Sequence, residues 1–225
     1  MKDTLMIHHH LGLGDHIICN GLVNELSRSK KIYLICKSQY YKNIRYLYRK
    51  NKNVRLIPLP KAMTRSIKSE KKSSKLLSFF LFTKINYVGF QQQPGDFFDE
   101  LFYKQANIDF LHRYKSFYVP QDSENMINIP ESKFRLIHKE SSLGEYNLDI
   151  KSDNLINIFV SKEFGKNIFS YIDLIKSAQE IHCVNSAFIH LVDSFILSSN
   201  LYFHDVRKHN NKFNLKNNWK VINYK

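Results

Sequence analysis

The sequence predicts an α/β protein made of two halves, residues 1–120 and 121–225, that face one another. Short apolar runs alternate with stretches whose apolar residues recur at helical spacing, and this alternation is typical of parallel sheets with right-handed crossovers. The alternation restarts after residues 120–133, a polar stretch with two prolines that has the composition of a linker. A chain of 225 residues, 43% of them hydrophobic, is long enough to bury a core in one domain or in two.

The first half opens with a strand at residues 5–8, a glycine-containing loop and a helix. The helix is indicated by Ile18, Leu22 and Leu26, which recur at helical spacing. The other elements expected in this half are strands at residues 32–36, 54–59 and 87–90 and helices at residues 40–48 and 97–103.

Residues 61–75 carry six basic residues against one Glu and run directly into the apolar stretch LLSFFLF at residues 76–82. This pattern has two interpretations. One is a patch that lies on an anionic membrane surface. The other, which we favour, is a solvated loop that leads into a buried helix.

The second half repeats the strand and helix alternation without a visible sequence repeat. A Ser-Ser-Leu-Gly loop follows its first strand. The expected elements are strands at residues 134–138, 155–160, 180–184 and 201–203 and helices at residues 168–178 and 187–197.

The net charge of +14 favours an anionic partner, such as a phosphorylated substrate, an acidic membrane or nucleic acid, although a Lys-, Asn- and Ile-rich composition can produce the same charge on a solvated surface. The basic residues are spread along the chain and no nucleic-acid motif is present, so we expect no nucleic acid partner. The three cysteines form no CxxC pair, which predicts buried thiols. No signal peptide and no apolar run of about 20 residues is visible, so we expect a cytoplasmic protein.

The stretch IHHHLGLGDHIICNGL, residues 7–22, is the first with chemical content. It is not a dinucleotide loop, because Ile17 stands where GxGxxG needs its third glycine and Lys37 follows the second strand where an acid is needed. At most His8 and His10 could share a face of an extended chain, and no second ligand cluster is visible, so neither a metal nor a cofactor is expected. His10 remains a candidate for lining a ligand cleft, since open α/β sheets bind ligands at the carboxyl ends of strands.

Asp15 stands at the start of the first helix and has two interpretations. The first is a carboxylate that simply stabilises the helix N-terminus. The second is a general base at the mouth of a cleft, able to take a proton from a hydroxyl nucleophile. On local evidence the first is favoured.

The stretch EIHCVNSAFIHLVDSF, residues 180–195, is the second stretch with chemical content. A strand ends before Asn185 and Ser186, and a helix begins at Ala187, so free backbone N–H groups and a hydroxyl could bind a diphosphate there. Asn185 and Ser186 could equally be helix caps, and His190 could be an ordinary core histidine.

Together the two stretches resemble glycosyltransferase family 9, the lipopolysaccharide heptosyltransferases. LGLGDHIICNGLV is similar to that family's LGD loop and following helix, and VNSAFIHLVDSF is similar to its D-[ST]-G-x-x-H-L stretch. The resemblance implies a GT-B fold, two Rossmann-like domains that face one another across a cleft. It implies that Asp15 is the base and that Ser186, Ala187 and His190 grip the diphosphate of a nucleotide sugar. Asn185 and Ala187 depart from the acid and the glycine of the second motif, and no Lys-x-Trp-Pro stretch is found.

The predicted function is therefore transfer of a sugar from a nucleotide-sugar donor to a hydroxyl of a glycan or lipid-linked acceptor, metal-independent and inverting. Residues 1–120 would form the acceptor side and residues 121–225 the donor side, and a peripheral contact with an anionic membrane stays open. Further substrate-binding candidates are His10, Gly12, Gly14, Lys139, Ser141, Ser142 and Asn185. The alternative is a non-catalytic GT-B-like protein that binds a phosphorylated ligand or an anionic membrane surface.

Overall fold

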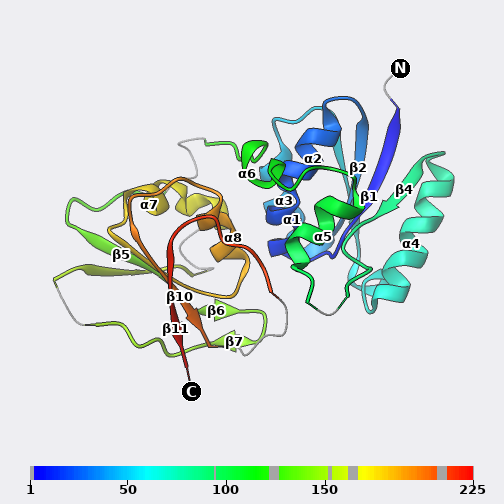
Figure 1. The fold of residues 1–225 in the computed structure, drawn as a ribbon. Coiled ribbons are helices and arrows are strands. Elements are labelled where there is room, and N and C mark those ends of the chain that lie inside the picture. The colour runs from blue at the N-terminus through cyan, green and yellow to red at the C-terminus, as the bar shows by residue number, and fades with distance from the viewer. Residues whose placement is uncertain are drawn as a thin grey trace. The chain divides into compact units, whose positions relative to one another are not determined.

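The computed structural model describes residues 3–93, 95–121, 127–151, 154–161, 167–206 and 212–224. The chain divides into two compact units, each built on a parallel sheet with helices packed against it (Figure 1). Unit 1 comprises Met1–Pro120 and Asn211–Asn214, and unit 2 comprises Gln121–Asn210 and Leu215–Lys225. The predicted α/β class with parallel sheets is confirmed. Part of the stretch taken as a linker, residues 122–126, lies outside the described residues.

Unit 1 contains a four-stranded parallel sheet in the order β3-β2-β1-β4. β1 is central, with Ile7 opposite Leu34 on one side and Asn86 on the other. β1 and β2 are buried apolar runs, as expected of strands covered on both faces. The elements of unit 1 are β1 (Thr4–His8), α1 (Leu13–Ile18), α2 (Asn20–Ser27), β2 (Lys31–Lys37), α3 (Tyr41–Tyr48), β3 (Val54–Leu59), α4 (Ile67–Phe80), β4 (Lys84–Tyr87), α5 (Phe98–Gln105) and α6 (His112–Lys115), with 3-10 turns at Ser38–Tyr40 and Lys61–Met63.

Unit 2 contains a five-stranded parallel sheet in the order β11-β10-β9-β5-β8. A small antiparallel hairpin, β6 and β7, follows β5. The elements of unit 2 are β5 (Phe134–His138), β6 (Glu140–Ser141), β7 (Gly144–Glu145), β8 (Ile156–Phe159), a 3-10 helix (Ile168–Tyr171), α7 (Ile172–Ser177), β9 (Glu180–Val184), α8 (Ala187–Asp193), β10 (Asn200–Asp205) and β11 (Trp219–Asn223).

The helix α4 corrects the interpretation of residues 61–82 as a loop leading into a buried helix. The helix begins at Ile67, inside the polar run, because Ser66 caps it and accepts a hydrogen bond from Ser69 N at 3.2 Å. The apolar residues at its end are not buried either, since Phe79 and Phe80 are exposed. Leu77 is the apolar residue of this stretch that packs against the core cluster of unit 1.

Other boundaries differ from the prediction for local reasons. The strand expected at residues 87–90 is β4, which ends at Tyr87 because Gly89 takes a φ of +85°. The first helix is interrupted at Cys19, and Gly14 lies inside α1, so it is not a turn residue. The helix expected to reach residue 197 ends at Asp193. α6 and β11 were not predicted: α6 has four residues, and β11 has five residues (WKVIN) without a regular polar and apolar alternation.

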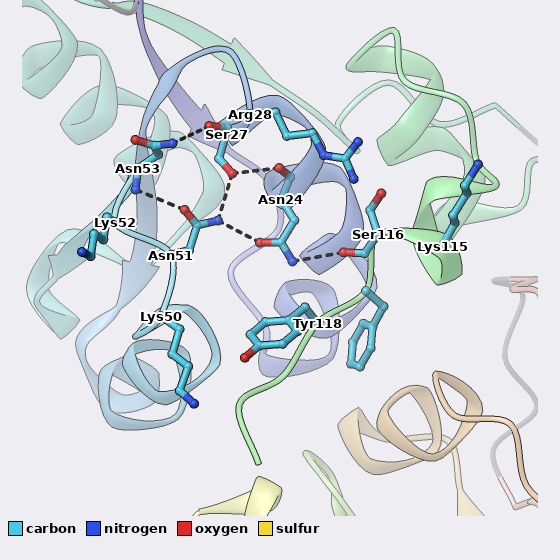
Figure 2. A pocket seen from close by; sticks show the side chains of 11 residues that line it. Asn24, Ser27, Arg28, Lys50, Asn51, Lys52, Asn53, Lys115, Ser116 and Tyr118 are labelled. Atoms are coloured by element: carbon cyan, nitrogen blue, oxygen red, sulfur yellow. Dashed lines mark hydrogen bonds between the residues drawn. The ribbon is translucent and has the colours of Figure 1, made fainter. Parts of the chain in front are cut away.

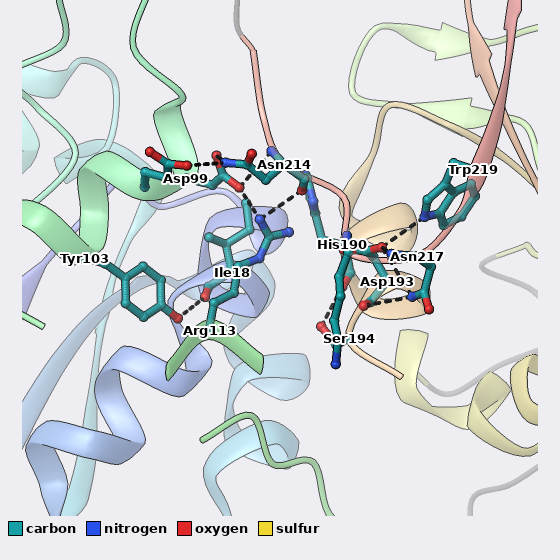
Figure 3. A network of polar contacts seen from close by, with 12 residues as sticks. Ile18, Asp99, Tyr103, Arg113, His190, Asp193, Ser194, Asn214, Asn217 and Trp219 are labelled. Atoms are coloured by element: carbon teal, nitrogen blue, oxygen red, sulfur yellow. Dashed lines mark hydrogen bonds and ion pairs between the residues drawn. The ribbon is translucent and has the colours of Figure 1, made fainter. Parts of the chain in front are cut away.

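Two buried carboxylates hold the segment Lys212–Trp219 at its two ends (Figure 3). In unit 1, Asp99 pairs with the buried Arg113 and accepts from Asn214 N at 2.9 Å, and Arg113 donates to the Asn214 carbonyl at 3.0 Å. In unit 2, Asp193 accepts from Lys216 N at 2.9 Å and from Trp219 Nε1 at 2.9 Å. Each end of the segment is therefore fastened by a carboxylate that belongs to its own unit.

Candidate functional site

The sheet topology indicates where each unit would bind a ligand. In open parallel sheets ligands bind at the carboxyl ends of the strands, at the point where the strand order reverses. In unit 1 that point lies between β1 and β4, and in unit 2 it lies between β5 and β9. The two sequence stretches singled out above follow β1 and β9, so each lies at the switch point of its own sheet.

Asp15 lies in the first turn of α1, directly after the loop that leaves β1. Its side chain turns back onto the loop, where Oδ2 accepts a hydrogen bond from Gly12 N at 3.1 Å. A Cβ atom on Gly12 would lie 2.6 Å from that same oxygen. A glycine at position 12 is therefore needed for the carboxylate to approach the loop, and this gives Gly12 a supporting role.

The environment of Asp15 changes its protonation. Burial raises the pKa of Asp15 from 3.8 to about 7, and the Gly12 N–H and the Lys37 charge oppose this shift only in part. Lys37 ends β2 and forms an ion pair with the buried Glu70 of α4 at 3.2 Å. Near neutral pH, Asp15 therefore exchanges a proton readily, which is the property required of a general base.

His10 lies between the carboxyl ends of β1 and β4. Its Nε2 donates to the Gly89 carbonyl at 2.8 Å, and its ring stacks on Phe90 with centroids 4.7 Å apart. This packing depends on Gly89, since a Cβ atom there would lie 2.2 Å from a ring carbon of Phe102 and 3.1 Å from Cδ2 of His10. His10 therefore lies at the switch point of unit 1, with one ring nitrogen engaged by the backbone, and its role in ligand binding stays a prediction.

The other three histidines of residues 7–22, namely His8, His9 and His16, are buried and electrically neutral. Burial lowers the pKa of His8 to about 3 and that of His9 to about 4, and it also lowers the pKa of His16. His8 hydrogen-bonds Ser74 of α4 at 2.7 Å, and the His9 and His16 rings meet edge to face, 4.3 Å apart. Among the described residues neither ring nitrogen of His16 has a hydrogen-bond partner.

In unit 2, Ser186 connects the switch point to the following helix. Its Oγ hydrogen-bonds Nδ1 of His138, the last residue of β5, at 3.1 Å and accepts from Phe188 N at 3.2 Å. The His138 ring stacks on Phe188 with centroids 4.9 Å apart. The Ser186 side chain is therefore the N-cap of α8, one of the two interpretations left open by the sequence.

The neighbours of Ser186 in the motif differ in exposure. Asn185 and Ala187 are partly exposed between β9 and the first turn of α8, at the carboxyl edge of the sheet. His190 is buried inside α8, and its carbonyl accepts from Ser194 Oγ at 2.7 Å. Asn185 and Ala187 are thus accessible to a ligand, whereas His190 is enclosed by its own unit.

Lys139, Ser141 and Ser142 lie on the stretch that leaves β5 and forms the β6-β7 hairpin. Lys139 pairs with Glu145 at 2.5 Å, and Ser141 Oγ accepts from Leu143 N at 3.1 Å. Ser142 is exposed at the turn. The three residues are near one another along this hairpin, but the described contacts do not include one between them and Ser186.

Two residues at the carboxyl edges of the sheets, Lys37 on the strand next to β1 and His138 at the switch point of unit 2, were not named as candidate site residues from the sequence. Each is the last residue of a parallel strand, β2 or β5. The rule that ligands gather at the carboxyl ends of strands could have found both.

A separate pocket of about 610 Å³ lies at the opposite edge of the unit 1 sheet (Figure 2). Its walls come from the end of α2, from residues 50–53 before β3 and from residues 115–118 at the end of α6, so the pocket lies beside the amino-terminal ends of β2 and β3. Figure 2 shows the amides of Asn24, Asn51 and Asn53 bonded to one another and to Ser27 along this wall. Because the amides satisfy one another, we regard this network as a support for the α2-β2 and α3-β3 connections.

In the ranges given above, no group of three or more His, Cys, Asp or Glu side chains is arranged to hold a metal ion. Within the same ranges, no helix has the length and apolar character needed to cross a bilayer.

No protein-family model matches the sequence, and no curated protein matches it. Several solved structures are similar to the chain, among them three glycosyltransferases. The glycosyl transferase family 9 protein from Veillonella parvula DSM 2008 has a TM-score of 0.52 and 10% sequence identity, over 99% of this chain and 87% of that one.

The other two structures are from Escherichia coli. The iron-containing dodecameric glycosyltransferase TibC from enterotoxigenic strain H10407 has a TM-score of 0.49 and 10% identity, over 91% of this chain and 58% of TibC. The heptosyltransferase WaaC, solved with ADP, has a TM-score of 0.48 and 9% identity, over 98% of this chain and 90% of WaaC. Of the three, the Veillonella protein supports a statement about this chain: the two share a fold, and the resemblance to glycosyltransferase family 9 is confirmed at that level.

Proposed function

We propose that the protein is a glycosyltransferase that moves a sugar from a nucleotide-sugar donor to a hydroxyl of a glycan or lipid-linked acceptor. The observation that carries the proposal is Asp15, a carboxyl group at the switch point of unit 1 whose pKa is raised to about 7 by burial. A pKa near the working pH is what an efficient general base requires. The shared fold with a family 9 glycosyl transferase supports the same assignment.

In the proposed reaction Asp15 accepts the proton of the acceptor hydroxyl as its oxygen attacks the anomeric carbon of the donor. The bond between that carbon and the diphosphate oxygen breaks, and the nucleoside diphosphate leaves with the electron pair. Attack opposite the leaving group inverts the anomeric centre. Unit 1 is the proposed acceptor side, with Gly12, Gly14 and His10 beside Asp15, and a cleft to which both units contribute is part of the proposal.

The proposed donor side is unit 2. Asn185, Ser186 and Ala187 lie at its switch point, where a diphosphate would meet backbone N–H groups. Lys139 follows His138, the residue that hydrogen-bonds Ser186, and would supply positive charge once it exchanges Glu145 for a phosphate. Ser141, Ser142 and His190 complete the residues that we propose bind the nucleotide sugar. In the proposal these residues, and no metal ion, stabilise the negative charge of the leaving diphosphate. The three buried free cysteines are compatible with the proposed cytoplasmic location.

The test is a ligand and turnover panel on the whole chain. Thermal stability is measured with UDP, GDP and ADP, because a ligand that binds the native state alone raises its stability by mass action. The nucleotide that stabilises the chain identifies the nucleotide sugars to be tried as donors, with release of the nucleoside diphosphate as the readout. Stabilisation together with release supports the proposal, and absence of stabilisation by all three nucleotides would contradict it.

A second candidate is a non-catalytic protein of the same fold that binds a phosphorylated ligand. One observation favours it: the Ser186 hydroxyl is already engaged by His138 and by Phe188 N. Stabilisation by a nucleotide with no release of diphosphate from any matching sugar donor, in the presence of a broad set of glycan acceptors, would favour this candidate.

A further inference from the structure

The helix α4 departs from the usual amphipathic arrangement. Its inner face, toward the sheet, carries Leu77 together with Glu70, Ser74 and Ser78, and the three polar residues are buried. Phe79 and Phe80 are 71% and 64% exposed. Globular proteins normally place the apolar stripe of a surface helix toward the core. Large apolar side chains on the outer face therefore indicate a partner outside the chain.

The end of α4 holds one more aromatic residue outward, at a cost in backbone energy. Thr83 N donates to the Ser78 carbonyl at 3.0 Å and Phe82 N to the Phe79 carbonyl at 3.1 Å, the two hydrogen bonds of a Schellman motif. Phe82 occupies the position that glycine usually takes, with a φ of 47°, and its side chain is 93% exposed. A phenylalanine at this position is unfavourable for the fold alone.

The same outer stripe carries positive charge. Lys68, Lys72 and Lys75 precede Phe79 at intervals of four, three and four residues, so they share its side of the helix. All three are exposed, and none forms an ion pair within the described part of the chain. The one acid of α4, Glu70, faces inward and pairs with Lys37. We call Lys68, Lys72, Lys75, Leu76, Phe79, Phe80 and Phe82 the α4 outer face.

We propose that the α4 outer face binds the surface of a bilayer that contains anionic phospholipids. Aromatic and aliphatic side chains next to unpaired lysines fit the boundary between acyl chains and acidic headgroups. A second copy of this chain is a poorer occupant, because it would bring two lysine-rich faces together. Figure 1 shows α4 beside β4, the edge strand of the sheet, with its outer side turned away from the sheet. The proposal does not rest on the proposed glycosyltransferase activity.

The experiment is co-sedimentation of the full chain with two kinds of vesicle. One contains phosphatidylcholine alone and the other about 30% phosphatidylglycerol. Two triple variants are tested. The lysine variant combines Lys68→Gln, Lys72→Gln and Lys75→Gln. The phenylalanine variant combines Phe79→Ser, Phe80→Ser and Phe82→Ser.

Each variant has a matched control. Lys50→Gln with Lys52→Gln and Lys115→Gln removes the same charge from the basic pocket of Figure 2. Leu111→Ser with Leu143→Ser and Ile196→Ser removes three exposed apolar side chains elsewhere.

We expect binding to the anionic vesicles that falls at least about tenfold in each α4 variant and less than about twofold in each control. Equal losses in the lysine variant and its control would overturn the proposal, because net charge alone would then explain binding. Absence of wild-type binding to the anionic vesicles would also overturn it. So would a wild-type dimer, seen by light scattering, that the phenylalanine variant abolishes without a change in vesicle binding.

Phe82→Gly separates binding from folding. Glycine removes the strain at a φ of 47°, so the melting temperature should rise by about 2–4 °C. Vesicle binding should fall severalfold in the same variant. If Phe82 served the fold, the variant would melt lower and bind vesicles as the wild type does.

Discussion

The two switch points differ in how their polar groups are satisfied. In unit 1, burial raises the pKa of Asp15 to about 7. Among the described residues, the two ring nitrogens of the next residue, His16, have no hydrogen-bond partner. In unit 2, Ser186 has both a side-chain and a backbone partner. A carboxyl group whose pKa is strongly shifted by burial is typical of a reactive site. A serine whose hydroxyl already has its hydrogen-bond partners is typical of an ordinary helix N-cap. The comparison supports the proposal that the chemistry takes place in unit 1 and that unit 2 binds the donor.

The largest expected effect is on turnover. Asp15→Asn keeps the size and the Gly12 contact of the side chain but removes the base, so turnover should fall about 10²–10⁴-fold while nucleotide binding is largely kept. Initial rates with the donor identified by the ligand panel measure this. Asp173→Asn, in the first turn of α7, is the matched control and should retain activity. Wild-type rates in Asp15→Asn would remove the assignment of the base.

The next effect compares the carboxylates that fasten the Lys212–Trp219 segment. Asp99→Ala leaves the buried Arg113 charge without its partner and should lower the free energy of unfolding by about 3–5 kcal/mol. Asp193→Ala leaves neutral N–H donors without an acceptor, which should cost about 2–3 kcal/mol. Urea unfolding of both variants measures the difference. A larger loss in Asp193→Ala would mean that the charge of Arg113 is compensated elsewhere.

A smaller effect concerns stability against pH. The pKa of Asp15 is raised in the folded protein, so the folded state binds the proton more tightly than the unfolded state does. The contribution of Asp15 to stability is therefore lost as pH rises from about 4 to about 7. Each unit of pKa difference is worth about 1.4 kcal/mol, so Asp15→Asn should be more stable than wild type by up to about 4 kcal/mol at pH 8 and equal to it near pH 3. Thermal melts at both pH values check this, and a pH-independent difference would contradict the raised pKa.

The smallest effect is in unit 2. Ser186→Ala removes the N-cap of α8 and should cost about 1 kcal/mol of stability. It should also weaken nucleotide binding by about 1 kcal/mol, the scale of one hydrogen bond. Titration calorimetry measures the change in nucleotide binding, and urea unfolding measures the change in the free energy of unfolding. Ser170→Ala, another buried serine of unit 2, is the control and should leave nucleotide binding unchanged.

The sequence located the candidate residues better than it described their environment. Asp15 and Ser186 each lie at the start of a helix that follows an apolar run, a pattern that is local in the chain, and the resemblance of the two stretches to glycosyltransferase family 9 made them candidates. The bonds that define their environment join distant residues. His138 lies 48 positions from Ser186, and Lys37 is 33 residues away from the Glu70 that pairs with it. No spacing rule within one element predicts such pairs.

By itself, the sequence determined the α/β class and the central strands β1, β2, β5 and β9, because strands covered on both faces must be continuous apolar runs. It also determined that an acid follows the first strand. Only the tertiary structure decided that this acid is desolvated, since burial depends on what packs around a side chain. It likewise decided that α4 turns its serines inward and its phenylalanines outward, because the face a helix buries is chosen by the sheet beneath it.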